Sequence, residues 1–285
     1  MVLMDIITFE RVVKTENKAR LFFKKYCWKN GHVFCTRCRS YRVYRIVHKR
    51  YRCKRCGYYT FHNFTGRWIN ELNISYRQWL WIIKLFELEI SARRISQQIN
   101  LIYPTVLKAM DLIRTAIAAG TEEPLLNGEI ELDETYFGGK RKGKRGRGAH
   151  NKVPVFGILE RDGIVKVEVL KNVTAESILN MTIKTVRRGS IVYTDKFRSY
   201  DTLMFCGYRH LRVDHRKRFV RGKVYINGLE GFWSYAKERL IKFHGVSKDK
   251  FPLYLKEMEF RYNHRKDAIF NLLGKKICNF VSNLL

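Results

Sequence analysis

The sequence lacks any apolar run that approaches the roughly 18 residues of a membrane-spanning helix. It also lacks a signal peptide, because residues 1–7 carry no basic segment, no long apolar core and no small-residue cleavage site. We therefore expect a protein that is not secreted and that works in the nucleus of a eukaryote or in the cytoplasm and nucleoid of a bacterium. In such a reducing compartment its seven cysteines are expected to be metal ligands or free thiols, because disulfides do not persist there.

Acidic residues are scarce: 26 Asp and Glu stand against 56 Lys and Arg, which gives the 285-residue chain a formal net charge of +30. Such a chain repels itself unless a polyanion relieves the repulsion. Nucleic acid is therefore the leading partner, and an anionic membrane surface is the alternative. Hydrophobic residues make up 46% of the chain, which is enough to build real cores in about two domains.

Four cysteines form two CxxC pairs, Cys35 with Cys38 and Cys53 with Cys56, and fourteen residues separate the pairs. Each CxxC turn presents two thiolates, and this separation is typical of a ribbon in which both turns hold one tetrahedral zinc ion. Between the pairs, aromatic and β-branched residues alternate with basic ones, as in the strands of such a ribbon. The alternative is four unrelated cysteines. We predict a Zn²⁺ ribbon at residues 31–66, after a helical segment at residues 1–30.

The other cysteines have no CxxC partners, and we expect them to be packed thiols: Cys27, Cys206 and Cys278. His62 is a further candidate ligand near the ribbon, but four cysteines already complete a zinc site.

Helical periodicity follows the ribbon over residues 70–120. The first helix begins near Ser75, Ser91 is expected to cap a second, and Pro104 to open a third. A short helix joined tightly to a third helix that carries Lys108 and Arg114 is the layout of a helix-turn-helix unit, with Lys108 placed to contact DNA. A plain helical connector is the alternative. A Pro and a Gly near residues 120–128 mark a domain boundary.

Residues from 128 onward predict an α/β domain. Strands are expected at residues 129–137, 153–160, 164–170, 190–195 and 208–213, with a helix that Thr174 caps. The segment between the first two strands is rich in Lys and Arg, and we expect a mobile loop that lies along DNA phosphates. Its basic residues are Lys140, Arg141, Lys142, Lys144, Arg145 and Arg147. A solvated surface loop or a nuclear localisation signal is the alternative.

Strands, a helix, a strand that ends in Asp and then further helices follow one another in the order of an RNase H-like core. In such a core the first and fourth strands lie side by side, so Asp133 and Asp195 can approach one site. Glu230, from a later helix, would complete it. Three carboxylates that repel one another need a cation, and hard oxygen ligands suit Mg²⁺ or Mn²⁺. Each also has a structural alternative: a turn cap for Asp133, a helix cap for Asp195, and an ion pair with Lys237 for Glu230. Four nearby acids could be surface residues: Glu129, Glu131, Glu134 and Asp162.

The later helix begins with NGLEGFWSYAK at residues 227–237. Leu229, Phe232, Trp233 and Ala236 supply its apolar positions. Asn227, Glu230 and Lys237 share another face of the helix. Taken alone, this face is a solvated surface with an ion pair; beside Asp133 and Asp195 it becomes a candidate part of the site, with Lys237 directed toward a phosphate.

Several blocks together resemble a known family. These are DETYFGG at residues 133–139, the Thr194–Asp195 pair, INGLEGFWSYAKERL, and GVSKDKFPLYLKEMEFRYNHR. They look like the ISXO2-like branch of insertion-sequence transposases, which have a zinc ribbon ahead of a DDE core, and like Merlin-type DNA transposases. The resemblance covers residues 34–266. It implies a metal-dependent enzyme that binds the terminal inverted repeats of its element, cleaves the ends and joins them to target DNA, as a homodimer or larger assembly on double-stranded DNA.

The resemblance also implies roles for single residues. Asp133 and Asp195 take the two aspartate positions, and Lys237 takes the basic position after the third acid. Some members of this branch have an Asn as the third residue, which matches Asn227. Because an amide carries no charge, we place Glu230 at the metal and Asn227 beside it.

His215 lies where the family has a His ahead of this helix, near the phosphates; a surface His in a basic stretch is the alternative. The segment TDKF departs from the small or acidic residue often found after the second Asp. The catalytic domain is expected at residues 128–266, with a helical tail at 267–285. Two rival functions are a domesticated or regulatory sequence-specific DNA-binding protein without catalysis, and a structure-selective nuclease on the same core. The presence of all three acids favours the transposase.

Overall fold

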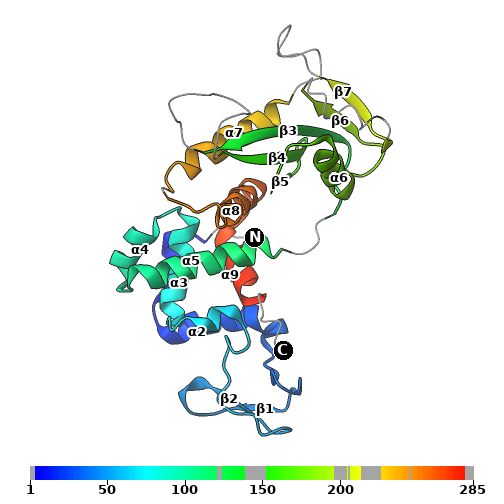
Figure 1. The fold of residues 1–285 in the computed structure, drawn as a ribbon. Helices are drawn as coiled ribbons and strands as arrows, with labels where there is room; N and C mark the ends of the chain where they lie inside the picture. Colours follow the sequence, from blue (N-terminus) through cyan, green and yellow to red (C-terminus); the bar gives the residue numbers. More distant parts are fainter. Residues whose placement is uncertain are drawn as a thin grey trace. The chain divides into compact units, whose positions relative to one another are not determined.

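The computed structural model of the protein describes residues 4–120, 124–138, 152–195, 204, 206–212, 226–243 and 245–279. The chain divides into two compact units (Figure 1). The first contains Met1–Gly120 and His264–Leu285, and the second contains Thr121–Asn263. No helix within the described ranges is long and apolar enough to cross a membrane.

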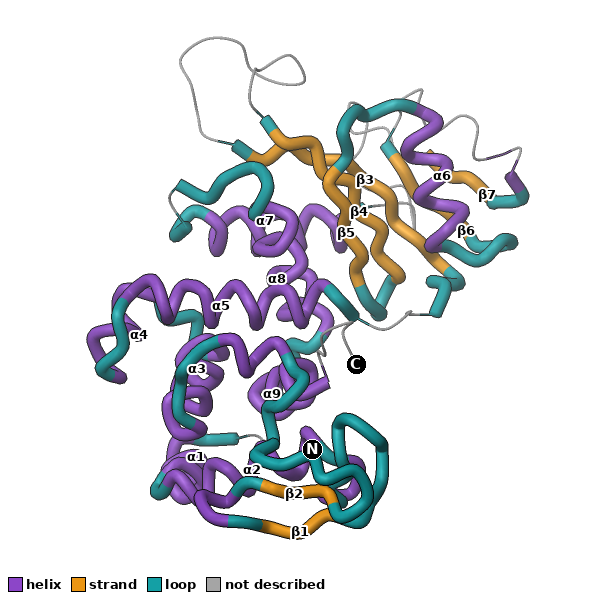
Figure 2. The backbone as a smooth tube through the Cα atoms, turned by 60° about the horizontal axis from the view of Figure 1, so that its bottom comes forward, coloured by secondary structure: helices purple, strands orange, loops and turns teal. Residues whose placement is uncertain are grey.

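Helices from both ends of the chain build most of the first unit. They are α1 (Ile6–Val13), α2 (Glu16–Cys27), α3 (Tyr76–Glu87), α4 (Ala92–Ile99), α5 (Tyr103–Ala118) and α9 (Ile269–Asn279), with 3-10 turns η1 (Lys29–Gly31), η2 (Val47–Lys49) and η3 (Trp68–Glu71). Helix α9 packs against α2, α3 and α5 (Figure 2). Phe270 of α9 contacts the rings of Phe9 and Phe22 edge-on or tilted, so the last helix closes the core that the first helices begin.

The three helices predicted between residues 70 and 120 are present as α3, α4 and α5, and their predicted start signals are in place. Ser75 and Gln78 form a capping box at α3, and the Ser91 side chain accepts a hydrogen bond from the Arg94 N–H at the start of α4. Asn100, with φ 52°, ends α4 in the left-handed region, and Pro104 lies in the first turn of α5. Local sequence signals therefore fix this tight connection.

The ribbon contains a short antiparallel hairpin of β1 (Val43–Arg45) and β2 (Tyr51–Cys53). Within it, Tyr51 and Cys53 are buried while Arg52 between them is exposed. This alternation matches the predicted strand pattern and turns one of the zinc-ligand candidates inward.

The second unit contains a five-stranded mixed sheet in the order β5-β4-β3-β6-β7. The strands are β3 (Glu129–Phe137), β4 (Val153–Glu160), β5 (Val165–Val169), β6 (Ile191–Thr194) and β7 (Arg209–Arg212). Strand β4 is antiparallel to both β3 and β5, whereas β6 pairs parallel with both β3 and β7. The predicted RNase H-like α/β fold is confirmed, including the side-by-side placement of the first and fourth strands.

Helices cover both faces of this sheet (Figures 1 and 2). Because side chains alternate across a strand, Ile130 and Leu132 of β3 share one core with Ile178 of α6 (Ala175–Thr185). Residues of the opposite face pack against α7 (Asn227–Leu240) and α8 (Phe251–Asn263). The odd-numbered residues of β3, including Asp133, thus face α7.

Side chains of α8 cover the outer edge of the sheet at β5. Asn263 accepts a hydrogen bond from the Val165 N–H and donates one to its carbonyl, each at 2.8 Å, and Glu259 accepts one from the Val167 N–H at 2.7 Å. Polar side chains therefore satisfy backbone groups that an edge strand otherwise leaves open to a second chain.

Candidate active site and metal centre

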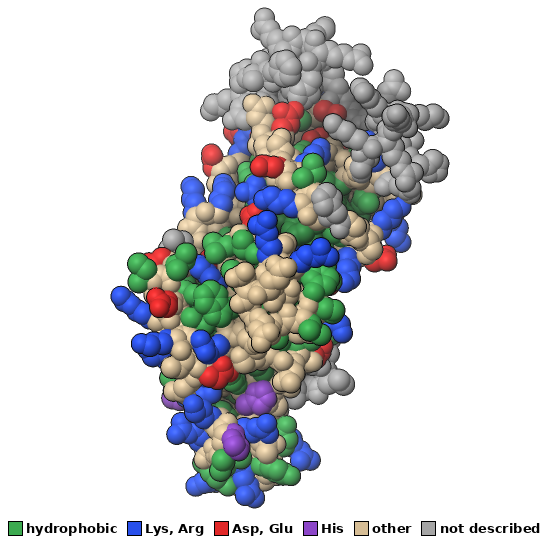
Figure 3. Space-filling model, turned by 90° about the vertical axis from the view of Figure 1, so that its left-hand side faces the viewer, with side chains coloured by type: hydrophobic (Ala, Val, Ile, Leu, Met, Phe, Trp, Pro, Cys, Tyr) green, Lys and Arg blue, Asp and Glu red, His purple; other side chains and the backbone are tan. Residues whose placement is uncertain are grey.

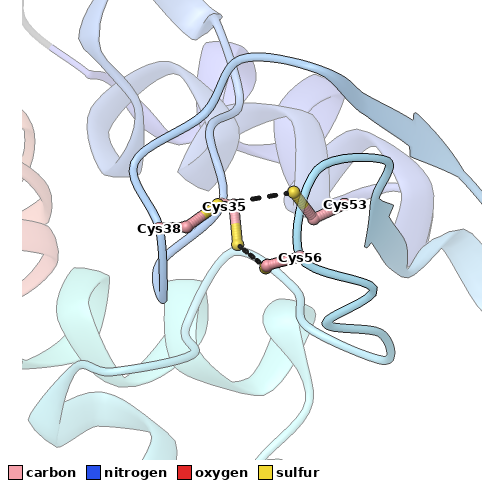
Figure 4. Close-up of side chains that lie close together, drawn as sticks. All are labelled: Cys35, Cys38, Cys53 and Cys56. Carbon is pink, nitrogen blue, oxygen red and sulfur yellow. Dashed lines mark hydrogen bonds between the residues drawn. The ribbon is translucent and has the colours of Figure 1, made fainter.

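The four cysteines predicted as zinc ligands lie together (Figure 4). The sulfur atoms of Cys35 and Cys56 are 3.6 Å apart, as are those of Cys38 and Cys53, and all four lie within 4.8 Å of one another. With Zn–S bonds of about 2.3 Å, the edge of a tetrahedron of sulfurs is about 3.8 Å, so the geometry fits one Zn²⁺. The predicted zinc site is supported, and His62 is not part of the cluster.

The surroundings of this cluster are strongly basic. Every charged residue between Glu16 and Glu71 is Lys or Arg. Tyr41, Tyr44 and Tyr59 are exposed among them, and Lys and Arg side chains surround the ribbon at the bottom of Figure 3. This acid-free stretch can be read from the sequence alone. It is easily overlooked because the whole chain is strongly basic.

The two aspartates of the candidate active site occupy matching positions on neighbouring parallel strands. The register pairs Glu131 of β3 with Tyr193 of β6. Asp133 lies two residues further along β3, and Asp195 lies two residues beyond Tyr193, directly after the end of β6. The two groups lie close enough that the charge of Asp195 raises the pKa of the Asp133 carboxyl. Both side chains are only partly buried.

Helix α7 runs alongside β3 and contacts three successive residues of its inward face. The Leu229 N–H donates to Glu131 at 3.0 Å, the Trp233 indole N–H to Asp133 at 3.0 Å, and the Lys237 ammonium to Thr135 at 2.8 Å. The contacts recur every four residues of the helix and every two residues of the strand. These steps are about 6 Å and about 6.6 Å long, so helix and strand residues stay opposite one another over this length. We call these three contacts the α7–β3 ladder.

The electrostatics of the ladder centre on Asp133. Burial, with the nearby charges of Glu134 and Asp195, raises the pKa of the Asp133 carboxyl to about 7, while the hydrogen bond from Trp233 acts in the opposite direction. Lys237 is exposed as a whole residue, but the part of its side chain that reaches Thr135 is desolvated, which lowers its pKa; the charge of Asp133 opposes that shift. A carboxylate whose charge is disfavoured by burial and by other carboxylates is a place where a divalent cation fits.

The close approach of α7 to the sheet depends on Gly157. This residue pairs with Asp133 across β3 and β4, and a Cβ atom added there would lie 2.5 Å from the Trp233 ring. The missing side chain leaves the indole room to lie over the sheet and reach Asp133.

The polar face of α7 is open to solvent. Asn227, Glu230 and Lys237 are all exposed. The alternative ion pair between Glu230 and Lys237 is not formed, since Lys237 binds Thr135 and the Glu230 carboxylate has no hydrogen-bond or ion-pair partner in the described chain. Within the same ranges, the four cysteines are the one group of three or more possible ligands whose atoms lie within 4.8 Å of one another.

The structure buries two charged residues that the sequence left open. Glu131, which the sequence suggested could lie at the surface, is 1% exposed and bound by Arg161, because it shares the inward face of β3 with Asp133. Arg114 on α5 is 1% exposed, pairs with Asp111 and lies over the Phe86 ring. Lys108, on the same helix, is exposed as predicted.

The remaining predicted DNA contacts lie outside the described residues. They are Lys140, Arg141, Lys142, Lys144, Arg145, Arg147 and His215.

A cavity of about 830 Å³ opens beside Lys237, at the end of the α7–β3 ladder. Phe137, Phe243, Phe251 and Tyr254 line it with aromatic rings, and Lys248 adds a second ammonium group. The candidate site therefore continues from carboxylates through Lys237 into an aromatic and basic cavity.

Comparison with known proteins identifies the family. Residues 125–263 match the model of the ISXO2-like transposase domain, and residues 14–59 match that of the transposase zinc-ribbon domain. An uncharacterized protein in transposable element ISH50 of Halobacterium salinarum is 31% identical over 284 residues, covering 91% of this chain and 93% of that protein. An uncharacterized transposase-like protein of Haemophilus influenzae is 45% identical over 96 residues, covering 34% of this chain and 78% of its own length. Among solved structures, the Mos1 strand transfer complex matches with a TM-score of 0.33 and 14% identity over 70% of this chain and 74% of that one. The chain belongs to the ISXO2-like transposases, a family with a zinc ribbon and a DDE domain.

Proposed function

We propose that the protein binds the terminal inverted repeats of its own element and catalyses metal-dependent DNA cleavage and strand transfer. The observation that carries this proposal is the matching placement of Asp133 and Asp195 on adjacent parallel strands, with α7 beside them in a transposase domain. Two carboxylates from strands that lie far apart in the chain, on neighbouring strands of one sheet, support a metal-binding site for phosphoryl transfer.

In this proposal Asp133, Asp195 and Glu230 hold Mg²⁺ or Mn²⁺, with Asn227 beside Glu230. The bound metal supplies the charge that activates a water or a 3′-hydroxyl and stabilises the leaving oxygen. Trp233 orients the Asp133 carboxylate by holding one of its oxygens. Lys237, anchored on Thr135, directs its ammonium toward the scissile phosphate.

DNA binding is assigned to the basic parts of the chain. The acid-free ribbon and the exposed Lys108 on α5 support a role for residues 31–120 in recognising the terminal repeats. The helix-turn-helix assignment of α3–α5 and the role of the basic segment at residues 138–152 belong to this proposal too. Two DNA ends must be processed together, so we propose a dimer or larger assembly on DNA.

The test is cleavage of labelled duplexes that carry the inverted repeats flanking the reading frame. Zinc-loaded wild-type protein should cleave when Mg²⁺ or Mn²⁺ is added but not without it, and Asp133→Asn and Asp195→Asn should reduce cleavage to background. Both variants should bind the same duplex within a few-fold of wild type. Glu168→Gln on β5, an exposed acid away from α7, is the matched control and should cleave normally.

Wild-type-like cleavage by either Asp variant would sink the assignment of the metal site. Tight binding of the repeats with no cleavage by any version of the protein would instead indicate a regulatory or domesticated DNA-binding protein.

A further inference from the structure

Helix α7 begins without a side-chain cap of its own. Its N-cap residue, Ile226, offers no hydrogen-bonding side chain, so the first N–H groups of the helix need an acceptor from elsewhere. Glu131 on β3 provides it: its Oε2 atom accepts from the Leu229 N–H at 3.0 Å, and the Gly228 N–H also acts on this carboxyl. A carboxylate from the strand thus does what a capping side chain does in other helices.

The contact requires a glycine in the first turn of α7. A Cβ atom on Gly228 would lie 2.3 Å from the Leu159 side chain and 2.9 Å from Glu131 Oε2. Any other residue there would push the start of the helix away from the strand. Gly231, one turn later, faces open space, since a Cβ atom there would meet no neighbouring group within 4 Å. It therefore provides an internal comparison.

Arg161 balances the charge of Glu131. Its Nε donates to Glu131 Oε1 at 3.0 Å and its Nη1 to Glu129 at 2.5 Å, and the guanidinium lies 3.8 Å from the centre of the Tyr193 ring. Tyr193 in turn donates from its hydroxyl to Glu129 at 3.2 Å. Both carboxylate oxygens of Glu131 therefore accept hydrogen bonds from the protein. We assign Glu131 to holding α7 on β3 and not to binding the metal.

This network joins the three elements that carry the proposed catalytic acids. Glu131 lies two residues before Asp133 on β3, Tyr193 two residues before Asp195 on β6, and Leu229 directly precedes Glu230 on α7. Each of these three residues therefore lies one or two positions from a proposed catalytic residue without being one itself.

We propose that Glu131, balanced by Arg161, is a positioning residue that fixes the first turn of α7 on β3 and so sets the place of Glu230 and Asn227 relative to the two aspartates. This inference rests on the proposed function. It predicts that loosening Glu131 damages metal binding and the chemical step while DNA binding persists, because the Glu131 carboxylate is buried among protein groups.

The experiment compares Glu131→Ala, Glu131→Gln and Gly228→Ala with wild type and with Gly231→Ala. Mn²⁺ binding is measured by titration calorimetry, and single-turnover cleavage is measured as a function of Mg²⁺ concentration. Glu131→Ala should weaken Mn²⁺ binding about 10- to 100-fold, as loss of a group that orients metal ligands does. It should slow cleavage by a similar factor at saturating DNA.

The conservative variant separates positioning from general damage. Glu131→Gln keeps the size and one acceptor for the Leu229 N–H, so it should recover part of both losses. Gly228→Ala should copy Glu131→Ala by displacing the helix without touching the charge, whereas Gly231→Ala should match wild type. If Glu131→Ala does not fold, the Gln and Gly228 variants decide the question.

Wild-type metal binding and cleavage in Glu131→Gln and Gly228→Ala would overturn the inference, as would a loss of DNA binding equal to the loss of cleavage. Failure of the proposed function looks different: wild type itself would not bind Mn²⁺, and Asp133→Asn would behave like wild type.

Discussion

The zinc ribbon and the proposed carboxylate site differ in how far apart their ligands lie in the sequence. The ribbon's ligands come from two tight turns that lie close in sequence, and a single hairpin brings the four sulfurs together. The proposed carboxylate ligands come from β3, from the end of β6 and from α7, which are separate elements of the second unit. We therefore expect the ribbon to need its zinc ion in order to fold. We expect the elements that carry the carboxylates to fold without a bound metal ion.

Losing a ribbon ligand should give the largest effect. Cys35→Ser is expected to abolish zinc binding and unfold the ribbon, because a structural zinc ion contributes on the order of 10 kcal/mol to such small domains. Zinc content, measured by elemental analysis, should fall from one ion per chain to near zero, and proteolysis should cut within residues 31–66. Cys206→Ser, which removes a thiol without a CxxC partner, should leave both unchanged. Retention of one zinc ion by Cys35→Ser would contradict the four-cysteine site.

Losing a proposed catalytic ligand should do the opposite: it should remove activity and leave the stability of the fold unchanged or higher. Asp133→Asn should eliminate cleavage, yet the unfolding temperature of the zinc-loaded protein without added Mg²⁺ or Mn²⁺ should stay the same or rise, because the change removes a partly buried charge that lies near Glu134 and Asp195. Thermal unfolding by circular dichroism measures this. A clear fall in the unfolding temperature would show that the carboxylate site is structural, as the ribbon is.

A packing change beneath the carboxylate site should have an intermediate effect. Gly157→Ala places a methyl group 2.5 Å from the Trp233 ring, and overpacking of this kind typically costs about 1–3 kcal/mol of unfolding free energy. Urea denaturation should show this loss together with slower cleavage. Unchanged stability would mean that Trp233 can move without cost, and the ladder would then be looser than its contacts imply.

Removing one surface charge should give the smallest effect. Lys108→Ala on α5 should weaken binding of the terminal repeats modestly and reduce the slope of log affinity against log salt by about 0.9, the value for one lost phosphate contact. The measurement is a binding titration at several salt concentrations. Lys14→Ala, at the end of α1, should leave the slope unchanged; an equal change in both would indicate a general charge effect instead of a DNA contact.

Local signals predicted the elements of the fold well. The alternation in residues 129–137 and 153–160 gave the observed bounds of β3 and β4, and the apolar spacing after Asn227 gave the start of α7. The first helix begins directly after Ser75, near the predicted start, and Ser91 caps the second helix as expected. These features depend on neighbours within a few residues, which is why the sequence reveals them.

The contacts between distant segments could not be predicted in this way. The sequence suggested only that Glu131 could be a surface residue, because acids are rarely buried; its burial depends on Arg161, thirty residues further along the chain. The partnership of Trp233 with Asp133 depends on the absence of a side chain at Gly157. The spacing of residues along a sequence does not show which residues from three separate segments will contact one another.

The regular spacing of the contacts between α7 and β3 limits which insertions and deletions these segments can accept. Adding or deleting one residue between Leu229 and Lys237 would rotate every later side chain of the helix by about 100° and remove Lys237 from Thr135. A one-residue change between Glu131 and Thr135 would turn the later side chains of the strand to the opposite face. The α7–β3 ladder therefore makes the length of each short block invariant, while it sets no limit on the length of the chain that joins them.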